Sequence, residues 1–236
     1  MAVSVVVHLL RHGRTRWNEQ RRYMGHTDQL LAPGALTELE PLRRRYHRHD
    51  FGKIYCSDLS RCRQTLGYVL SATGADQDPA LIPAKLGETV PGVCYDVRLR
   101  ELDFGQWEGK TYDDLKENPA YRSWIDDPSS VTPPGGESWE AFQQRIGQFL
   151  NNLYLELDEM AGAAESEALE GGHGKRPEAA CGPSDVLIVT HGGVIRQMMT
   201  QLVDGVKFWA LPLEPGEALR VRLTRSSAGW RGERLP

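Results

Sequence analysis

Cysteine is scarce in this chain of 236 residues, and its thiols follow no metal-binding or redox pattern. The sequence holds no CxxC pair and no zinc-finger spacing, so nothing in it predicts a zinc finger or a disulfide framework. We interpret the thiols as the reduced, buried or half-buried cysteines of a cytosolic protein. They are Cys56, Cys62, Cys94 and Cys181.

Long apolar runs are also missing. No stretch approaches the ~18 apolar residues that a membrane span requires. The N-terminal segment MAVSVVVHLL lacks the basic residues of a signal peptide, and its short apolar run is interrupted by His8. We therefore expect a soluble, cytoplasmic protein without a membrane partner.

Positive charge is not in excess either. The chain has 28 lysines and arginines against 32 acidic residues, a net charge of −4. Such a balance argues against nucleic acid as a partner, and it means that any anion site must be built locally. The basic run from Arg43 to His49 is short and contains Tyr46 as its single aromatic residue, so we interpret it as a solvated helix face.

What the chain does contain is an alternation of strand and helix patterns. Short apolar, valine-rich runs are typical of buried strands, and longer segments with apolar residues at helical spacing separate them. This order favours an α/β fold with a mostly parallel sheet. We predict a single domain over 1–236, in which the Gly- and Pro-rich segment 161–184 forms an exposed loop. The expected strands are 3–10, 53–56, 95–99, 185–190 and 218–223, and the clearest helices are 59–70, 139–157 and 194–203.

Chemically capable side chains follow four of the expected strands. Arg11 and His12 come after the first, Arg61 after the second, Glu101 after the third and His191 after strand 185–190. Ligands of such sheets bind beyond the carboxyl ends of the strands, so these residues should converge. Arginine forks match phosphate oxygens, histidine is a nucleophile toward phosphorus, and a carboxylate serves as general acid and base.

Each of these residues also has a plainer interpretation when taken alone. A single histidine at a strand end is more often structural, and Arg61 alone would be a surface charge. Glu101 could be an ion-pair partner, and His191 with two following glycines could form a tight turn. The occurrence of all of them at strand ends favours the phosphoryl-transfer hypothesis.

The motifs around these residues resemble those of the histidine phosphatase superfamily, which includes the cofactor-dependent phosphoglycerate mutases. The resemblance rests on LLRHGRTRWN, SDLSRCRQT, RELDFGQWEG and VTHGG, in the family's order and over nearly the whole chain. It implies a three-layer α/β/α fold, a mostly parallel sheet with a small helical insertion over the site. It also implies a phosphorylated small molecule as substrate and no metal or other cofactor.

The family's roles carry over to matching positions. His12 would be the nucleophile that becomes a phosphohistidine, and Glu101 would be the proton donor and acceptor. Four residues would bind the phosphoryl group: Arg11, Asn18, Arg61 and His191.

The segments FGQWEGKTYDDL, PPGGESWEAF and RRYMGHTDQLL resemble the α-ribazole phosphatase branch, which acts in cobalamin biosynthesis. The resemblance therefore implies α-ribazole 5'-phosphate hydrolysis, with phosphoglycerate mutase and a broad-specificity sugar or acid phosphatase as alternatives. The segment APGALTELEPL and the insert 161–184 depart from that branch, so the sequence does not determine the substrate.

The sequence does not determine the oligomeric state either, and a homodimer is one alternative. We favour Trp107 as a packing residue over Trp107 as a wall for an aromatic substrate.

Overall fold

The computed structural model describes residues 3–72, 90–170 (backbone only from 163) and 185–236. Six strands form one sheet in the order β3-β2-β4-β1-β5-β6. The first four run parallel, β5 is antiparallel to β1, and β6 is antiparallel to β5. The strands are β1 (Ser4–Arg11), β2 (Lys53–Cys56), β3 (Val93–Tyr95), β4 (Val186–Thr190), β5 (Ala218–Ser226) and β6 (Gly229–Leu235).

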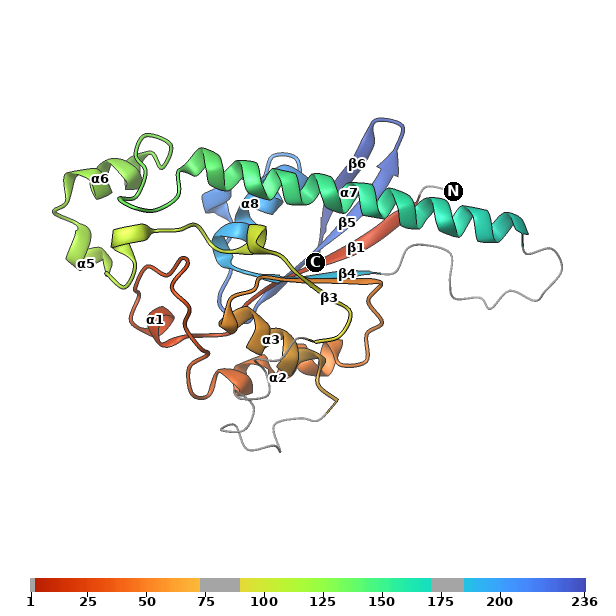
Figure 1. The fold of residues 1–236 in the computed structure, drawn as a ribbon, viewed down its shortest axis with the longest axis horizontal. Coiled ribbons are helices and arrows are strands. Elements are labelled where there is room, and N and C mark those ends of the chain that lie inside the picture. The colour runs from red at the N-terminus through yellow and green to blue at the C-terminus, as the bar shows by residue number, and fades with distance from the viewer. Residues whose placement is uncertain (1–2, 73–89, 171–184) are drawn as a thin grey trace.

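Helices cover both faces of this sheet (Figure 1), as the predicted three-layer architecture requires. Side chains alternate along each strand, so Leu9 faces a core with α7 and α8, whereas Leu10 faces a second core with α2 and α3. Both leucines are buried. The helices are α1 (Arg16–Glu19), α2 (Ala35–Tyr46), α3 (Ser60–Leu70), α5 (Tyr112–Leu115), α6 (Pro119–Asp126), α7 (Trp139–Glu170) and α8 (Gly192–Leu202), with 3-10 turns η1 (Val97–Leu99), η2 (Gly105–Trp107) and η3 (Phe208–Ala210).

The segment of η2, α5 and α6, called the helical insertion below, packs around Trp107. Its ring is buried and meets Tyr121 and Trp124 edge-on, with centroids 5.5 and 5.7 Å away. This confirms Trp107 as a packing residue. Pro119 stands at the first turn of α6, where a missing N–H costs nothing, and the Asn118 side chain caps that helix.

Two predicted elements differ in the structure. The prediction of a strand over 95–99 is wrong after Tyr95, because the Asp96 carboxylate accepts a hydrogen bond from Arg98 N at 2.8 Å and caps η1 instead. The predicted loop 161–184 is wrong for its first ten residues, because α7 continues to Glu170 through a segment rich in alanine and glutamate, both strong helix formers. Residues 171–184 lie outside the described part of the chain.

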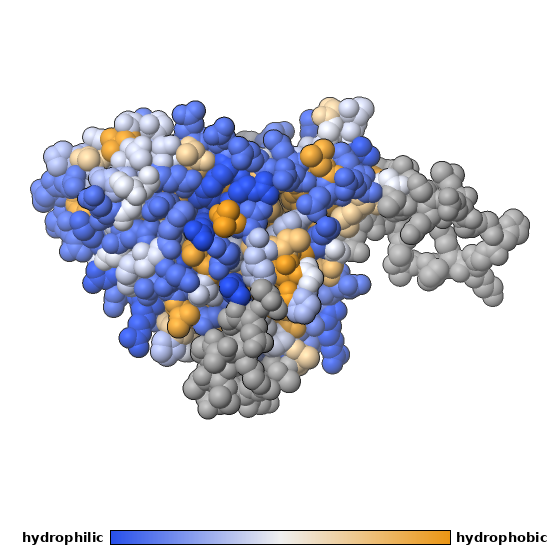
Figure 2. Space-filling view, viewed as in Figure 1, coloured by the Kyte–Doolittle hydropathy of each residue, from blue (hydrophilic) through white to orange (hydrophobic). Residues whose placement is uncertain are grey.

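Within the described ranges, no helix is long and apolar enough to cross a membrane. The face of the molecule drawn in Figure 2 is mainly hydrophilic, with hydrophobic residues in small, separate patches. That face therefore presents no extended apolar surface.

Candidate active site

The carboxyl end of β1 places His12 in the interior, with 2% of its surface exposed. Its Nδ1 lies 2.7 Å from the Gly13 carbonyl oxygen. A carbonyl only accepts, so Nδ1 carries the ring proton and Nε2 keeps its lone pair. Burial lowers the pKa of His12 well below 6.5, and the charges of Arg61 and Arg11 lower it further. A neutral imidazole with a free nitrogen is a nucleophile.

Two buried arginines flank His12. Arg61, in the first turn of α3, is 0% exposed and donates to Gly25 O at 2.7 Å and Thr27 O at 3.0 Å. Arg11 donates to the Leu213 carbonyl, and its Nε is buried without a hydrogen-bond partner. Neither forms an ion pair within the described chain, and burial lowers the pKa of both. Neutral carbonyl oxygens hold the two guanidinium groups in place but leave their positive charge unbalanced, so the two arginines form a binding site for an anion.

His191 is the N-cap residue of α8 and stands edge-on to His12, with ring centroids 5.1 Å apart. Arg61 Nε donates to His191 Nδ1 at 3.2 Å, so His191 Nε2 carries the proton and donates to Ser57 Oγ at 2.9 Å. Burial is the first cause that lowers the pKa of His191 well below 6.5, and nearby Arg61 is the second. The structure thus joins His191 to both His12 and Arg61.

Glu101 follows η1 and reaches the N-terminus of α8. Its Oε2 accepts from Gly193 N at 2.8 Å, and its Oε1 accepts from Leu102 N at 3.0 Å. A Cβ at Gly193 would lie 2.2 Å from Glu101 Oε1, so any larger residue would displace the carboxylate. Gly193 therefore makes room for Glu101, and the two glycines begin helix α8 instead of forming a separate tight turn.

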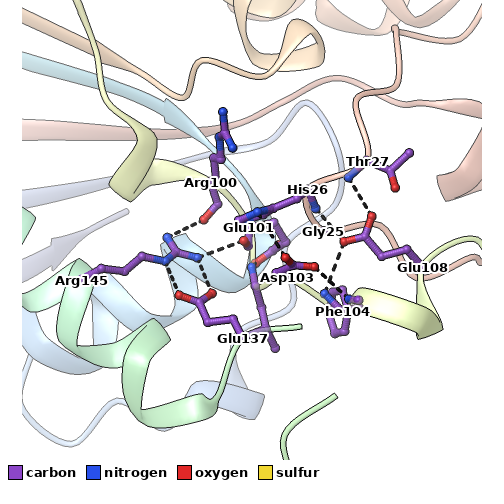
Figure 3. A network of polar contacts seen from close by, with 12 residues as sticks. Gly25, His26, Thr27, Arg100, Glu101, Asp103, Phe104, Glu108, Glu137 and Arg145 are labelled. Atoms are coloured by element: carbon purple, nitrogen blue, oxygen red, sulfur yellow. Dashed lines mark hydrogen bonds and ion pairs between the residues drawn. The ribbon is translucent and has the colours of Figure 1, made fainter. Parts of the chain in front are cut away.

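A clamp from α7 fixes the backbone that carries Glu101 (Figure 3). The Arg145 guanidinium donates to three carbonyls, those of Arg98, Arg100 and Glu101, at 2.6 to 2.9 Å. Glu137 holds the other side of the fork through two contacts of 2.7 and 2.8 Å. Sequence reasoning missed this pair, because the helical pattern of α7 is set by its apolar face.

Glu108 organises the loop that holds Arg61 (Figure 3). Its two carboxylate oxygens accept from His26 N and Thr27 N, each at 2.7 Å. The neighbouring Gly25 is required because a Cβ there would lie 2.2 Å from Leu102 O. Sequence reasoning also missed Glu108, although a carboxylate between an aromatic residue and a glycine in RELDFGQWEG was a usable signal.

The Asn18 side chain has a structural role at the start of α1. The Asn18 Oδ1 accepts from Thr15 N and Thr15 Oγ1, both at 3.0 Å, in a capping box around α1. The hydrogen bonds that the Asn18 side chain forms in the described part of the chain go to Thr15. At the start of α3, Ser60 N donates to Asp28 Oδ1 from a distant loop at 2.8 Å.

A cavity of about 510 Å³ opens beside Glu101. Of the described residues that line it, Arg196 is the one cation, and its Nε donates to Leu211 O at 3.0 Å. Most of the wall is aromatic. Tyr23 comes from the loop after α1, and the other rings come from the segment 104–124, from α7 and from η3: Phe104, Trp124, Trp139, Phe142, Phe208 and Trp209. The arrangement suits a phosphate at His12 joined to an apolar, flat group that extends past Glu101.

Known proteins share this architecture along most of their length. An adenosylcobalamin/alpha-ribazole phosphatase of Salmonella typhimurium is 25% identical over 95% of this chain and 98% of its own. Fructose-2,6-bisphosphatase TIGAR of Xenopus tropicalis is 28% identical over 85% of this chain and 76% of its own. A phosphoglycerate mutase structure from Bacillus anthracis covers 99% of this chain and 93% of its own, with a TM-score of 0.65; at 21% identity it shows the fold alone.

Residues 7–161 match the family model of the histidine phosphatase superfamily, branch 1. The match begins in β1, spans the segments that carry His12, Arg61 and Glu101, and ends within α7. It covers well over half of the chain, and this chain therefore belongs to the histidine phosphatase superfamily.

Proposed function

We propose that this protein hydrolyses a phosphomonoester through a phosphohistidine on His12. The single observation that carries the proposal is the state of that side chain. It is buried, its Nδ1–H donates to Gly13 O, and burial lowers its pKa well below 6.5. It lies near two arginines that form no ion pair with a carboxylate in the described part of the chain.

The first half-reaction transfers the phosphoryl group to the enzyme. Nε2 of His12 supplies the electron pair for the new N–P bond as the P–O bond to the leaving group breaks. Glu101, in its protonated form, gives its proton to the departing oxygen. Arg11 and Arg61 stabilise the charge on the three non-bridging oxygens, because neither guanidinium is in an ion pair with a carboxylate among the described residues.

Water completes the cycle. Glu101, now a carboxylate, takes a proton from a water molecule whose oxygen attacks phosphorus, and the N–P bond electrons return to His12 Nε2. Asn18 and His191 provide further hydrogen bonds in this proposal. Asn18 uses its amide nitrogen, since its Oδ1 is held in the cap, and His191 exchanges Ser57 for a phosphoryl oxygen.

The leaving group that we propose is α-ribazole, a nucleoside with an apolar aromatic base, which would place the enzyme in cobalamin biosynthesis. The aromatic walls beside Glu101 support it, as does the likeness to an alpha-ribazole phosphatase. A phosphoglycerate mutase or a sugar bisphosphatase must bind a second anionic group. Among the described residues of this cavity, Arg196 is the sole cation for that purpose.

A turnover comparison in EDTA tests the proposal. The substrates are α-ribazole 5'-phosphate, 3-phosphoglycerate, glucose 6-phosphate and AMP, with a 2,3-bisphosphoglycerate-primed isomerisation assay for mutase activity. We expect hydrolysis without metal, highest kcat/KM for α-ribazole 5'-phosphate, an acid-labile phosphoenzyme, and loss of all three in His12→Ala. Full activity in His12→Ala would refute the mechanism, whereas faster isomerisation than hydrolysis would refute the hydrolase.

A further inference from the structure

Three potential metal ligands meet at the amino-terminal end of the parallel strands, opposite the catalytic end. His8 lies within β1 and is 4% exposed, although it sits in an otherwise apolar strand. Asp185 immediately precedes β4, and His49 lies between α2 and β2. The mechanism proposed above uses none of them, and a buried histidine in a core strand is costly unless its nitrogens have partners.

The potential ligand atoms lie within hydrogen-bond distance of Asp185 and close enough together to surround one ion. Asp185 Oδ2 is 3.2 Å from His8 Nε2 and 3.1 Å from His49 Nε2, and the three ligand atoms all lie within 4.8 Å of one another. In a tetrahedral zinc site with ligands about 2.0–2.1 Å from the metal, neighbouring ligand atoms are separated by about 3.4 Å. The two Asp185 contacts are within a few tenths of an ångström of that spacing, and the two histidine nitrogens lie within 4.8 Å of each other, so side-chain rotation can bring the three ligand atoms around one ion.

The opposite nitrogen of His8 supports this role. Coordination through Nε2 requires the proton on Nδ1, which then needs an acceptor. Tyr46 supplies one, because its hydroxyl lies 3.1 Å from His8 Nδ1 and its ring is 1% exposed. Tyr46 meets the His8 ring at 90°, and Phe51 packs against it from another side.

We propose that His8, His49 and Asp185 form a binding site for a divalent transition metal, Zn²⁺ first, with water as a fourth ligand. Two imidazoles and one carboxylate are borderline ligands that suit Zn²⁺ over Mg²⁺ or Ca²⁺. The ion would tie β1, β4 and the end of the Arg43–His49 run together, so its effect is on stability. Arg45 and Arg220 lie near this cluster and oppose a cation, so we expect moderate affinity.

Isothermal titration of EDTA-stripped protein with ZnCl₂ tests the site, with His49→Ala as the variant and His47→Ala as its matched control. His49 is exposed, so its removal should leave the fold intact. His47 belongs to the same basic run, but its Nδ1 contacts Arg43 O instead of the triad. We expect one zinc per chain with a Kd in the micromolar range in the wild type and His47→Ala, and at least tenfold weaker binding in His49→Ala.

Two further readouts keep the result specific. Co²⁺ in place of Zn²⁺ should give the visible absorption of a tetrahedral site, and His49→Ala should abolish it. Saturating Zn²⁺ should raise Tm by several degrees in the wild type and not in His49→Ala, because a ligand that binds the folded state stabilises it. Equal zinc affinity in wild type and His49→Ala, or no binding at ~100 µM Zn²⁺, would overturn the proposal.

Discussion

The two halves of the candidate active site are built by different means. The phosphate end consists of residues at the carboxyl ends of β1, β2 and β4, which neighbouring strands hold in fixed register. The cavity beyond Glu101 is walled by side chains from the helical insertion, α7, α8, η3 and the loop after α1, none of which belongs to the sheet. The first half holds polar groups in the interior, and the second holds aromatic rings with one arginine. The chemistry therefore resides in the sheet, and the choice of leaving group resides in the peripheral segments.

Glu101 lies at the boundary of the two halves, so we expect its substitution to have the largest effect on activity and to depend most strongly on the leaving group. In Glu101→Gln we expect kcat/KM for an alkyl phosphate to fall by about 10²- to 10⁴-fold, since the leaving oxygen loses its proton donor. p-Nitrophenyl phosphate has a leaving group that needs no proton. Stopped-flow kinetics should thus still show a burst of nitrophenol, followed by slow turnover because water loses its base. An equal loss in both half-reactions would contradict this assignment.

Arg145 provides a smaller and more indirect perturbation of the same boundary. Arg145→Lys keeps the charge but loses the planar fork that holds three carbonyls and Glu137. We expect kcat to fall about 10- to 100-fold, with KM nearly unchanged, because a small displacement of a catalytic group costs that much. Because Arg145 positions Glu101, Arg145→Lys should slow alkyl phosphates more than nitrophenyl phosphate, as Glu101→Gln does. A loss that is equal for alkyl and nitrophenyl phosphates would indicate a merely structural role.

The cavity can be tested without touching the phosphate end. Trp209 lines it yet is 65% exposed, so Trp209→Ala should leave the fold intact. We expect KM for a substrate with an aromatic leaving group to rise about 10-fold, equivalent to ~1.4 kcal/mol of lost ring contact. Glucose 6-phosphate should be turned over within twofold of wild type. Tyr112→Ala is the matched control, because Tyr112 is 50% exposed and does not line the cavity.

The same division explains what the sequence could predict. Residues at strand ends were identifiable because β1, β2 and β4 are short, apolar and bounded by polar motifs, and strand direction then determines where they meet. The cavity wall was not predictable, because η3 and the insertion come together through tertiary packing that no local pattern encodes. The antiparallel β6 was missed because its sequence GWRGERL has charged residues where a buried strand would be apolar. The second role of Asn18, whose oxygen closes the capping box of α1, was also not predicted.

The smallest expected difference between the two halves is in how each contributes to the pH dependence of the free energy of unfolding. Folding lowers the pKa of His12 and His191 well below 6.5, so below that pH the unfolded chain binds protons that the folded chain does not. The free energy of unfolding should therefore fall as pH drops from 6.5 to 5, by up to about 1.4 kcal/mol per pH unit for each such histidine. Urea titrations at several pH values measure this slope. His12→Gln should make it shallower, whereas Trp209→Ala should shift the curve without changing the slope, because the aromatic half contributes no buried base. Parallel curves for the wild type and His12→Gln would show that His12 is not held neutral by its surroundings.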